Sequence, residues 1–498
     1  MNRMKQSFDM KHTISRIAIT LFLVLGMTLP GVSQEPSVSP ELPDQLILDL
    51  EGAIDHAVTY NKSLQNARLE VERSRKSIWE TIAAGLPQVD GTLDYMSYFN
   101  YELAFNFGGG EAPSFTPQQL QEAYDQTVSV FPFYTQQDVA MLGANTYYES
   151  QLQSMLDPTT ILLSDQSTAT LRVSQLIFSG QYILGIQTAK LGRLISEQNY
   201  EYNELNIKES VISAYYLVLI TGETLEILEQ NVENLEETLE QTRIMYKSGM
   251  AEQTDVDQLR ITVNQISDAR NAMERNLELN YNMLRFQLGI EANVDLMLSD
   301  SLETLFANMQ AESALDAPFT IENNATYQLM QTQEEISKKM LGLEQWNYAP
   351  SISGFYNYNA KILTSGFDMN PNHLVGLNMS VPIFSSGVRK ARVDQARIEY
   401  NMAQINKSIL EDQLKLQERQ FKYNLQSSLD NLYTQKENVE VAQRVYDSYR
   451  RKFEQGMATS LDLTQANSNY LDAESNYFTA IMEVMNAKLQ LDKLMNTL

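Results

Sequence analysis

The sequence SGMAEQTDVDQL (248–259) recurs 207 residues later as QGMATSLDLTQA (455–466), and this pair decides the fold. Each copy predicts a helix end, a short turn and the start of a new helix. Glycine can adopt the left-handed conformation that ends a helix, and a following hydroxyl group can cap the next helix with an aspartate near its positive end. These residues are Gly249, Thr254 and Asp255 in the first copy, and Gly456, Ser460 and Asp462 in the second. The pattern predicts two helical tips, at residues 248–254 and 455–460.

Two segments upstream of the tips also occur in both halves of the chain. LRVSQLIFSG (171–180) aligns with LNMSVPIFSSG (377–387), and GLPQVDGTLDY (85–95) aligns with YAPSISGFYNY (348–358). The offset is 206 residues for the first pair and 263 for the second, so the first copy carries about 57 additional residues between these segments. This self-similarity indicates an internally duplicated helix–strand–strand–long helix–turn–helix unit. The two copies are expected at residues 49–289 and 321–498, joined by a connecting segment at 290–320.

Alternating polar and apolar residues predict two strands in each copy. The strands are expected at about residues 87–99 and 167–178, and at about 350–359 and 374–383. The alternation fits a half-buried sheet in water and also the wall of a membrane barrel. Trp79 and Trp346, the only tryptophans, each lie shortly before the first strand of a copy. They fit an interfacial aromatic belt or a buried core, and both interpretations stay open.

Two stretches without proline predict long helices, at residues 181–247 and 387–455. At 1.5 Å per residue each reaches about 100 Å. Apolar residues recur at alternating spacings of 3 and 4, which predicts coiled-coil packing rather than cofactor binding. Two shorter helices placed end to end match one long helix, so each copy predicts a long helix paired with two short ones. The shorter helices are expected at residues 50–84, 254–288, 321–346 and 460–495. Rods of this length indicate the wall of an elongated assembly.

Composition excludes several classes of function. The chain has no cysteine, which excludes disulfides, thiolate metal sites and cysteine nucleophiles. Its formal net charge of −26 repels phosphate backbones, so we expect no nucleic-acid partner. The charge fits a solvated surface, and part of it also fits a lumen that favours cations. No phosphate loop, metal-ligand spacing or nucleophile–base set is present, so we expect no enzyme, no cofactor and no metal site.

The N-terminus predicts export. Basic residues precede an apolar run, which is typical of a secretory signal peptide and places it at residues 1–33, before a linker at 34–48. That run is too short to span a bilayer, and we find no other apolar stretch long enough to span as a helix. A membrane-inserted form must then span as strands. Four strands cannot close a barrel and an open edge is not tolerated in lipid, so closure requires several copies.

The repeat resembles the outer membrane efflux protein (TolC) family. The resemblance covers nearly all of the chain after the signal peptide. The matching residues are Tyr246, Gly249, Asp255 and Val256; Phe453, Gly456, Asp462 and Leu463; Leu86 and Pro87; and IFSG at 177–180. It implies a mainly α-helical protein that forms a homotrimer with one 12-stranded β-barrel, four strands from each chain. A periplasmic α-helical barrel of coiled-coil helices would continue that barrel.

The resemblance also implies a function and partners. It implies an exit duct in the outer membrane of a Gram-negative bacterium, in contact with outer membrane lipid. A periplasmic adaptor (membrane fusion protein) and an inner-membrane transporter of the RND, ABC or MFS type would dock at its periplasmic end. The additional residues of the first copy, about 100–165, would lie at the extracellular mouth and cap or narrow it.

The family places its periplasmic constriction near the second tip. Asp462 occupies the position of one acidic residue of that constriction, and Gln465 stands where the family has a second one. Three copies of Asp462 would raise each other's pKa and attract cations. Ala458 replaces a basic residue often found in the tip loop, so the closed state has fewer polar links. The residues expected at the tips and adaptor-docking surface are Gly249, Met250, Thr254, Asp255, Gly456, Met457, Ala458 and Ser460.

Two alternatives remain at this stage. The tips are explained equally by a plain helix-hairpin turn without further function. The chain as a whole could be a periplasmic coiled-coil scaffold or adaptor outside the membrane, although two tips and four strands argue against that. The sequence does not identify the cargo, and its 22 methionines fit core packing better than copper binding.

Overall fold

The computed structural model describes most of the chain after the N-terminal segment. The described residues are 45–99, 101–105, 159–163, 165–363 and 371–498, with isolated positions between 116 and 149. The expected signal peptide, most of the linker and most of the insertion at 100–165 lie outside them.

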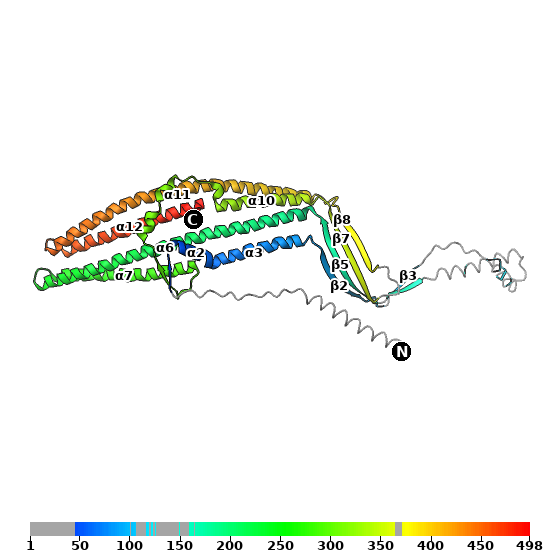
Figure 1. Ribbon diagram of the computed structural model, residues 1–498, viewed down its shortest axis with the longest axis horizontal. Coiled ribbons are helices and arrows are strands. Elements are labelled where there is room, and N and C mark those ends of the chain that lie inside the picture. Colours follow the sequence, from blue (N-terminus) through cyan, green and yellow to red (C-terminus); the bar gives the residue numbers. More distant parts are fainter. Residues whose placement is uncertain are drawn as a thin grey trace, which may run out of the picture.

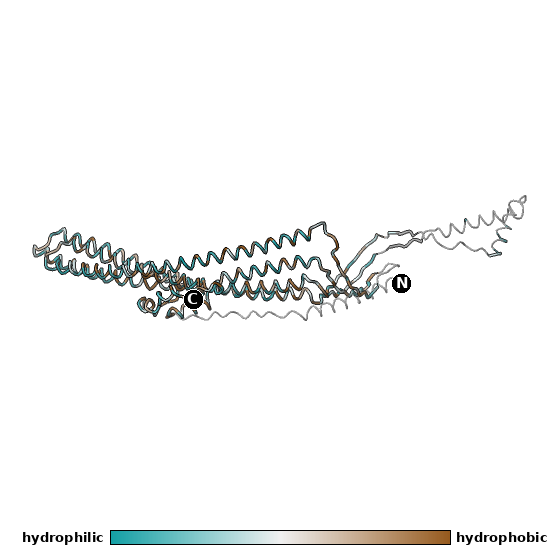
Figure 2. Tube along the Cα trace, turned by 90° about the horizontal axis from the view of Figure 1, so that it is seen from above, coloured by the Kyte–Doolittle hydropathy of each residue, from teal (hydrophilic) through white to brown (hydrophobic). Residues whose placement is uncertain are grey.

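Two long helices run through most of the molecule, and each is accompanied by two short ones (Figure 1). Helix α6 (Gly180–Lys247) packs along α3 (Lys62–Ala83) and α7 (Gln253–Leu288), and α11 (Val388–Glu454) packs along α10 (Ala325–Trp346) and α12 (Ser460–Met495). Helix α10 also contacts α6, which joins the two copies of the unit. Hydrophobic and hydrophilic residues interleave along these helices (Figure 2), as coiled-coil packing requires.

A four-stranded antiparallel sheet continues one end of the helical part at an angle to it (Figure 1). Its strand order is β2–β5–β7–β8. The strands are β2 (Gln88–Met96), β5 (Gln166–Phe178), β7 (Ser351–Leu363) and β8 (His373–Ser380). Strand β7 runs four residues beyond its expected end, and β8 stops three residues short of its own. Strands β2 and β8 each leave one edge without a partner among the described residues.

The insertion begins and ends in a two-stranded ribbon. Strand β3 (Tyr101–Phe105) pairs antiparallel with β4 (Thr159–Leu163), with Tyr101 opposite Leu163. Of the insertion between these strands, only isolated positions are described, so the expectation that it caps or narrows a mouth stays a prediction.

The helix expected at residues 50–84 is two helices. Helix α2 (Leu50–Tyr60) ends at Tyr60, and Asn61 separates it from α3. The Asn61 side chain accepts hydrogen bonds from the backbone N–H groups of Ser63 and Leu64 and donates one to the carbonyl oxygen of Gln287, 2.8 Å away. The break is therefore a buried cap that ties α3 to α7.

The second copy repeats this cap at the same offset. Asn324, 263 residues after Asn61, precedes α10, which follows a short 3-10 turn at Ile321–Asn323 rather than beginning at 321. Its side chain caps α10 and donates a hydrogen bond to the carbonyl oxygen of Leu494 over 2.9 Å. The prediction that one helix begins at residue 321 was therefore wrong, because the α-helix begins at Ala325.

A parallel strand pair at the middle of the molecule has no counterpart in the sequence-based prediction. Strand β1 (Gln45–Leu48), inside the expected linker, pairs with β6 (Asp295–Leu298), inside the expected connecting segment. Two short helices follow β6, α8 (Leu302–Asn308) and α9 (Ala311–Asp316). The hydroxyl of Tyr215 donates hydrogen bonds to the carbonyl oxygen of Leu48 and to Asp300, which fixes this segment against α6.

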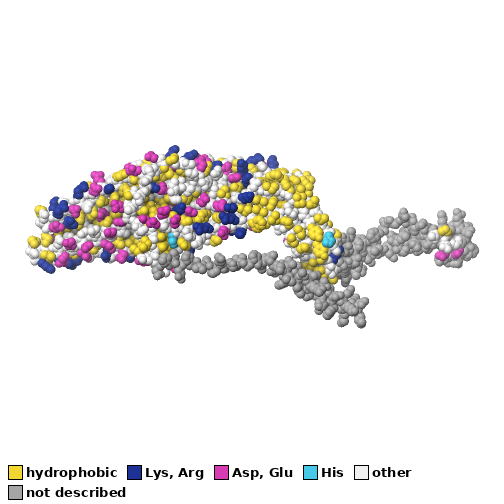
Figure 3. Space-filling view, viewed as in Figure 1, with side chains coloured by type: hydrophobic (Ala, Val, Ile, Leu, Met, Phe, Trp, Pro, Cys, Tyr) yellow, Lys and Arg dark blue, Asp and Glu magenta, His cyan; other side chains and the backbone are white. Residues whose placement is uncertain are grey.

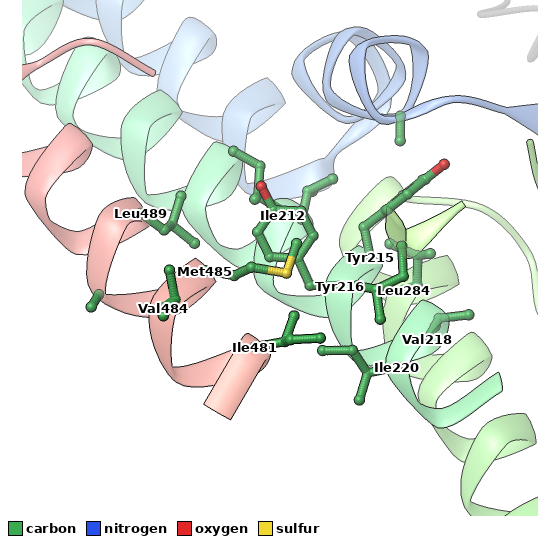
Figure 4. Close-up of a cluster of buried hydrophobic side chains, with 14 of the residues drawn as sticks. Ile212, Tyr215, Tyr216, Val218, Ile220, Leu284, Ile481, Val484, Met485 and Leu489 are labelled. Atoms are coloured by element: carbon green, nitrogen blue, oxygen red, sulfur yellow. The ribbon is translucent and has the colours of Figure 1, made fainter. Parts of the chain in front are cut away.

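The largest hydrophobic cluster surrounds the middle of α6. Figure 4 shows Ile212 and Tyr216 of α6 close to Ile481, Val484 and Met485 of α12. Helix α6 is also long and apolar enough to span a membrane by length and composition, contrary to the expectation that no such helix follows the N-terminal run. Several of its apolar residues are buried in this cluster, so a core helix explains the same feature.

Candidate functional site: an uncovered sheet and two joined helical tips

One face of the four-stranded sheet is apolar, and the register shows why. Leu171 of β5 lies opposite Gly91 of β2 on one side and opposite Tyr358 of β7 on the other, so apolar positions of all four strands share a face. The members of this apolar face with large exposed side chains are Val89, Leu93, Tyr95, Leu171, Tyr356, Tyr358, Val375, Leu377 and Met379. Val375 and Leu377 are 79% and 76% exposed, so none of the described residues covers the face at these positions.

The opposite face of the sheet is polar. It carries Asp90, Thr92 and Asp94 of β2, and the Thr170 hydroxyl donates a hydrogen bond to Asn359 Oδ1 over 2.9 Å. A half-buried sheet in water would have its apolar face packed on a core and its polar face solvated. Here the apolar face is exposed as well as the polar one, since every residue of β2 and all but one of β8 are exposed, and an exposed apolar face is the arrangement of a sheet whose apolar side faces lipid.

Both tryptophans lie at helix ends next to the sheet. Trp79 on α3 is 61% exposed, and Trp346 closes α10 and is 43% exposed, so neither belongs to the buried core. The Trp346 ring contacts Phe178 edge to face, with ring centroids 6.4 Å apart. It also occupies the space that a Cβ on Gly180 would fill, which explains the glycine at the start of α6.

Glycine ends the long helix at both tips. Gly249 has φ +77° and Gly456 has φ +71°, the left-handed conformation that favours glycine. The next residues, Met250 and Met457, are 70% and 66% exposed. Behind the turns a second hydrophobic cluster joins the helices, with Ala458 packed against it; its buried members are Leu235, Leu239, Val256, Leu259, Val263, Tyr446, Phe453, Leu463 and Ala466.

The capping residues differ from the expected Thr254 and Ser460. Helix α7 begins after Glu252, whose backbone N–H donates a hydrogen bond to Asp255 Oδ2 over 3.0 Å. Helix α12 begins after Thr459, whose backbone N–H and hydroxyl both donate to Asp462 Oδ2, over 3.0 and 2.7 Å. The aspartates therefore act as the third residue of each helix and close a reciprocal cap.

Ser460 has another role. Its hydroxyl, in a buried side chain, donates a hydrogen bond to Asp255 Oδ1 over 2.6 Å and so joins the two tips within one chain. Neither the repeat nor the local pattern predicted this contact, because its partners come from different copies of the unit.

Asp462 and Gln465 are both exposed on the first turns of α12. The hydrogen bonds from Thr459 hold the pKa of Asp462 below its usual range, whereas the expected threefold repulsion acts in the opposite direction. Gln465 donates a hydrogen bond to Asn469 Oδ1 over 2.9 Å rather than to Asp462. The two expected constriction residues thus lie on neighbouring turns of one exposed helix surface, and Gln465 bonds to Asn469.

Further along the tip hairpins, the packed helices contain polar groups that sequence reasoning missed. The side-chain amides of Asn231 on α6 and Asn467 on α12, both buried, bond reciprocally over 2.9 and 3.2 Å. A cleft of about 230 Å³ next to them is lined by residues that include Tyr470 and Glu474. Burial raises the pKa of Glu474 despite a hydrogen bond from Tyr470. An asparagine in an apolar helix stripe is the signal that could have found the first pair.

The sequence profile of the family described as "Outer membrane efflux protein" matches residues 141–290 and 320–497. The outer membrane protein TolC of Vibrio cholerae is 22% identical over 343 residues, which cover 67% of this chain and 78% of the relative. The probable efflux pump outer membrane protein TtgC of Pseudomonas putida is 24% identical over 336 residues, covering 66% and 67%. The proteases secretion protein PrtF of Dickeya chrysanthemi is 20% identical over 269 residues, covering 53% and 58%.

Solved structures share the fold along almost the whole chain. CusC superposes with a TM-score of 0.66 at 14% identity, covering 91% of this chain and 93% of CusC. The outer membrane protein VceC of Vibrio cholerae superposes with a TM-score of 0.63 at 15% identity, covering 90% and 95%.

Proposed function

The chain belongs to the outer membrane efflux protein family, and we propose that three copies of it form one continuous exit duct through the outer membrane and into the periplasm. Membership places the protein in the outer membrane of a Gram-negative bacterium, as an exit duct of an efflux or secretion system.

The single observation that supports this trimeric assembly is the exposed sheet. Strands β2 and β8 each have one edge without a partner among the residues that the structure describes, and the sheet has one apolar and one polar face. Free backbone N–H and C=O groups are not tolerated in lipid, so the edge of β8 in one copy must pair with β2 of the next. Three copies then give a barrel of 12 strands, apolar outside and polar inside.

The helices would continue this barrel as a periplasmic tube. At 1.5 Å per residue, the 68 residues of α6 extend about 100 Å from the sheet. The tips would form the periplasmic entrance, with Asp462 and Gln465 at its constriction. The exposed Met250 and Met457 would belong to the surface that receives a periplasmic adaptor.

We infer a passive conduit that catalyses no reaction. Its partners would be a periplasmic adaptor and an inner-membrane transporter of the RND, ABC or MFS type, and the transporter would choose the cargo. The names of the relatives, an efflux pump component and a protease secretion protein, fit one duct design serving several kinds of cargo. A periplasmic scaffold outside the membrane would leave the apolar sheet face without a covering.

Cysteine cross-linking tests the assembly, because the natural chain has no cysteine. Val89 and Met379 lie at the helix-proximal ends of the two edge strands, on the apolar face. A chain carrying both Val89→Cys and Met379→Cys, treated with a short bifunctional thiol reagent in isolated outer membranes, should give covalent dimers and a closed trimer. Each single variant should stay monomeric on a denaturing gel.

Two further measurements complete the test. The assembled protein should conduct ions in a planar bilayer, and its oligomer should dissociate on heating. A double-cysteine protein that yields only monomers while it fractionates with soluble periplasmic proteins would overturn the proposal.

A further inference from the structure

The helix ends next to the sheet carry a positive charge that the rest of the chain does not share. We define the junction band as residues 73–83 of α3, 180–196 of α6, 336–346 of α10 and 388–398 of α11. It contains eleven Lys and Arg against three Asp and Glu, a net charge of +8, whereas the whole chain carries −26. All eleven lie within about 20 Å of the point where their helix meets the sheet, at 1.5 Å per residue.

Most of this charge is not neutralised by ion pairs within the described part of the protomer. Among the described residues, only Arg73, Arg75 and Arg193 of the band form ion pairs, with Glu70 or Glu197. Lys76 and Lys390 are exposed and have no acidic partner among those residues. A band that served only to hold the helices together would place its charges against carboxylates.

The band lies beside the apolar surface of the sheet. Figure 3 shows, on one face of the molecule, hydrophobic side chains over the sheet and the adjoining helix ends, and then a group of Lys and Arg before the mixed surface of the remaining helices. Trp79 lies within the band, and Arg389 stacks over the ring of Tyr348, with its Cζ 6.0 Å from the ring centroid. Exposed aromatic rings beside basic side chains are typical of the headgroup layer of a bilayer.

We propose that the junction band binds the anionic headgroups of phospholipids in the periplasmic leaflet of the outer membrane. The proposal rests on the proposed function, because it requires the sheet to cross the bilayer. The phosphates would accept hydrogen bonds from exposed Lys and Arg while the acyl chains cover the apolar sheet face. This contact would set the depth of the duct in the bilayer, in the same way that a basic cluster beside a membrane segment recruits acidic lipid.

The two tryptophans provide the readout, because the chain has no others and both lie at this level. The full mature protein is reconstituted in phosphatidylethanolamine vesicles with one-fifth phosphatidylglycerol, and either lipid carries brominated acyl chains at the same mole fraction. Enrichment of the anionic lipid should make brominated phosphatidylglycerol quench the tryptophan fluorescence about threefold more strongly than brominated phosphatidylethanolamine. The difference should shrink when the salt concentration rises from 0.05 to 0.5 M, because salt screens the headgroup charge.

Two matched variants isolate the band. Replacing Lys76, Lys338, Lys390 and Arg392 by Gln should make the two brominated lipids quench equally. The control variant, with exposed basic residues nearer the tips replaced by Gln, should keep the wild-type difference; these are Lys247, Lys436, Arg444 and Arg451.

The remaining outcomes each decide a different point. Equal quenching by both lipids in the wild-type protein, independent of salt, would overturn the lipid site and leave the duct intact. Quenching by neither lipid would mean that the sheet is not in the bilayer and would overturn both proposals. A band variant that loses its heat-dissociable oligomer would show that the band joins subunits, which overturns the lipid site. The salt response of the wild-type protein tests the lipid site without any substitution, so the test does not depend on how the variant folds.

Discussion

The Ser460 hydroxyl donates a hydrogen bond to Asp255 Oδ1 over 2.6 Å and thereby joins two helical tips that are 205 residues apart in sequence. Asp255 uses its other oxygen, Oδ2, to accept from the backbone N–H of Glu252 at the start of its own helix. One carboxylate therefore fixes the geometry of the first tip and holds the second tip against it. Any opening that separates the two tips of a chain must break this bond.

Ser460→Ala should favour the open state of the duct. A hydrogen bond to a charged acceptor contributes about 1.5–3 kcal/mol, so its loss should raise the ratio of open to closed states by about tenfold or more. Single-channel recording in planar bilayers measures this ratio. Thr254→Ala is the control, because the Thr254 hydroxyl donates its hydrogen bond to Glu252 within the first tip rather than to the second tip. Equal behaviour of the two variants would show that the inter-tip bond does not hold the closed state.

Asp462→Asn should reduce the cation selectivity of the duct, and Gln465→Glu should increase it. Both side chains are exposed on the same turns of α12, where three copies would bring their charges together. The reversal potential in a salt gradient measures the selectivity. Unchanged selectivity in both variants would place the constriction elsewhere.

The pH dependence of that selectivity should depend on Thr459. Hydrogen bonds from Thr459 lower the pKa of Asp462, so its charge is present at neutral pH and is lost only as the pH falls through the lowered pKa. Thr459→Val removes the hydroxyl bond, and the pH at which half of the selectivity is lost should rise. A midpoint that stays in place or falls would contradict the assigned cause.

Local sequence patterns predicted the parts of the fold that depend on neighbouring residues. Stretches without proline predicted the long helices, the 3 and 4 spacing of apolar residues predicted their packing, polar–apolar alternation predicted the strands, and Gly249 and Gly456 marked turns that require a positive φ. What the patterns did not contain was the partner of each element. The pairing of β1 with β6 joins residues 250 positions apart. A strand of only four residues within a linker is too short to show the alternation that would predict it.

The roles of side chains at helix starts were harder to predict from the sequence than the helices themselves. Thr459 and Ser460 are adjacent hydroxyl residues, and either fits a cap in the sequence; backbone conformation assigns the cap to Thr459 and frees Ser460 for the other tip. Asn61 lies in a stretch that otherwise fits one helix, and its cap is stabilised by the distant carbonyl of Gln287. Such residues are recognised only when the elements that they join are already placed.

Asn467→Leu should destabilise the assembly by more than the loss of one hydrogen bond alone would. Its partner Asn231 would remain buried with an unpaired amide, which costs about 1–3 kcal/mol, whereas replacing both residues by Leu removes both polar groups and should recover much of that loss. Thermal unfolding followed by circular dichroism compares the single and double variants. Ser468→Ala, on the neighbouring exposed position, is the control. A double variant less stable than the single one would mean that the amide pair itself is the source of stability.

Glu474→Gln should stabilise the protein at neutral pH and have little effect in acid. Burial raises the pKa of Glu474, and its Oε2 has no hydrogen-bond partner among the described residues, so the folded state favours the protonated form. A carboxyl group with a raised pKa binds more protons in the folded state than in the unfolded state between the two pKa values. Its contribution to stability is therefore complete below the unfolded pKa and is lost as the pH rises through the folded pKa.

The melting temperature of Glu474→Gln should exceed that of the wild-type protein at pH 7.5, and the difference should shrink toward pH 4. Asp472→Asn, at an exposed neighbouring position, is the matched control. Equal melting curves of Glu474→Gln and the wild-type protein at both pH values would show that the cleft hydrates Glu474 in the assembled duct.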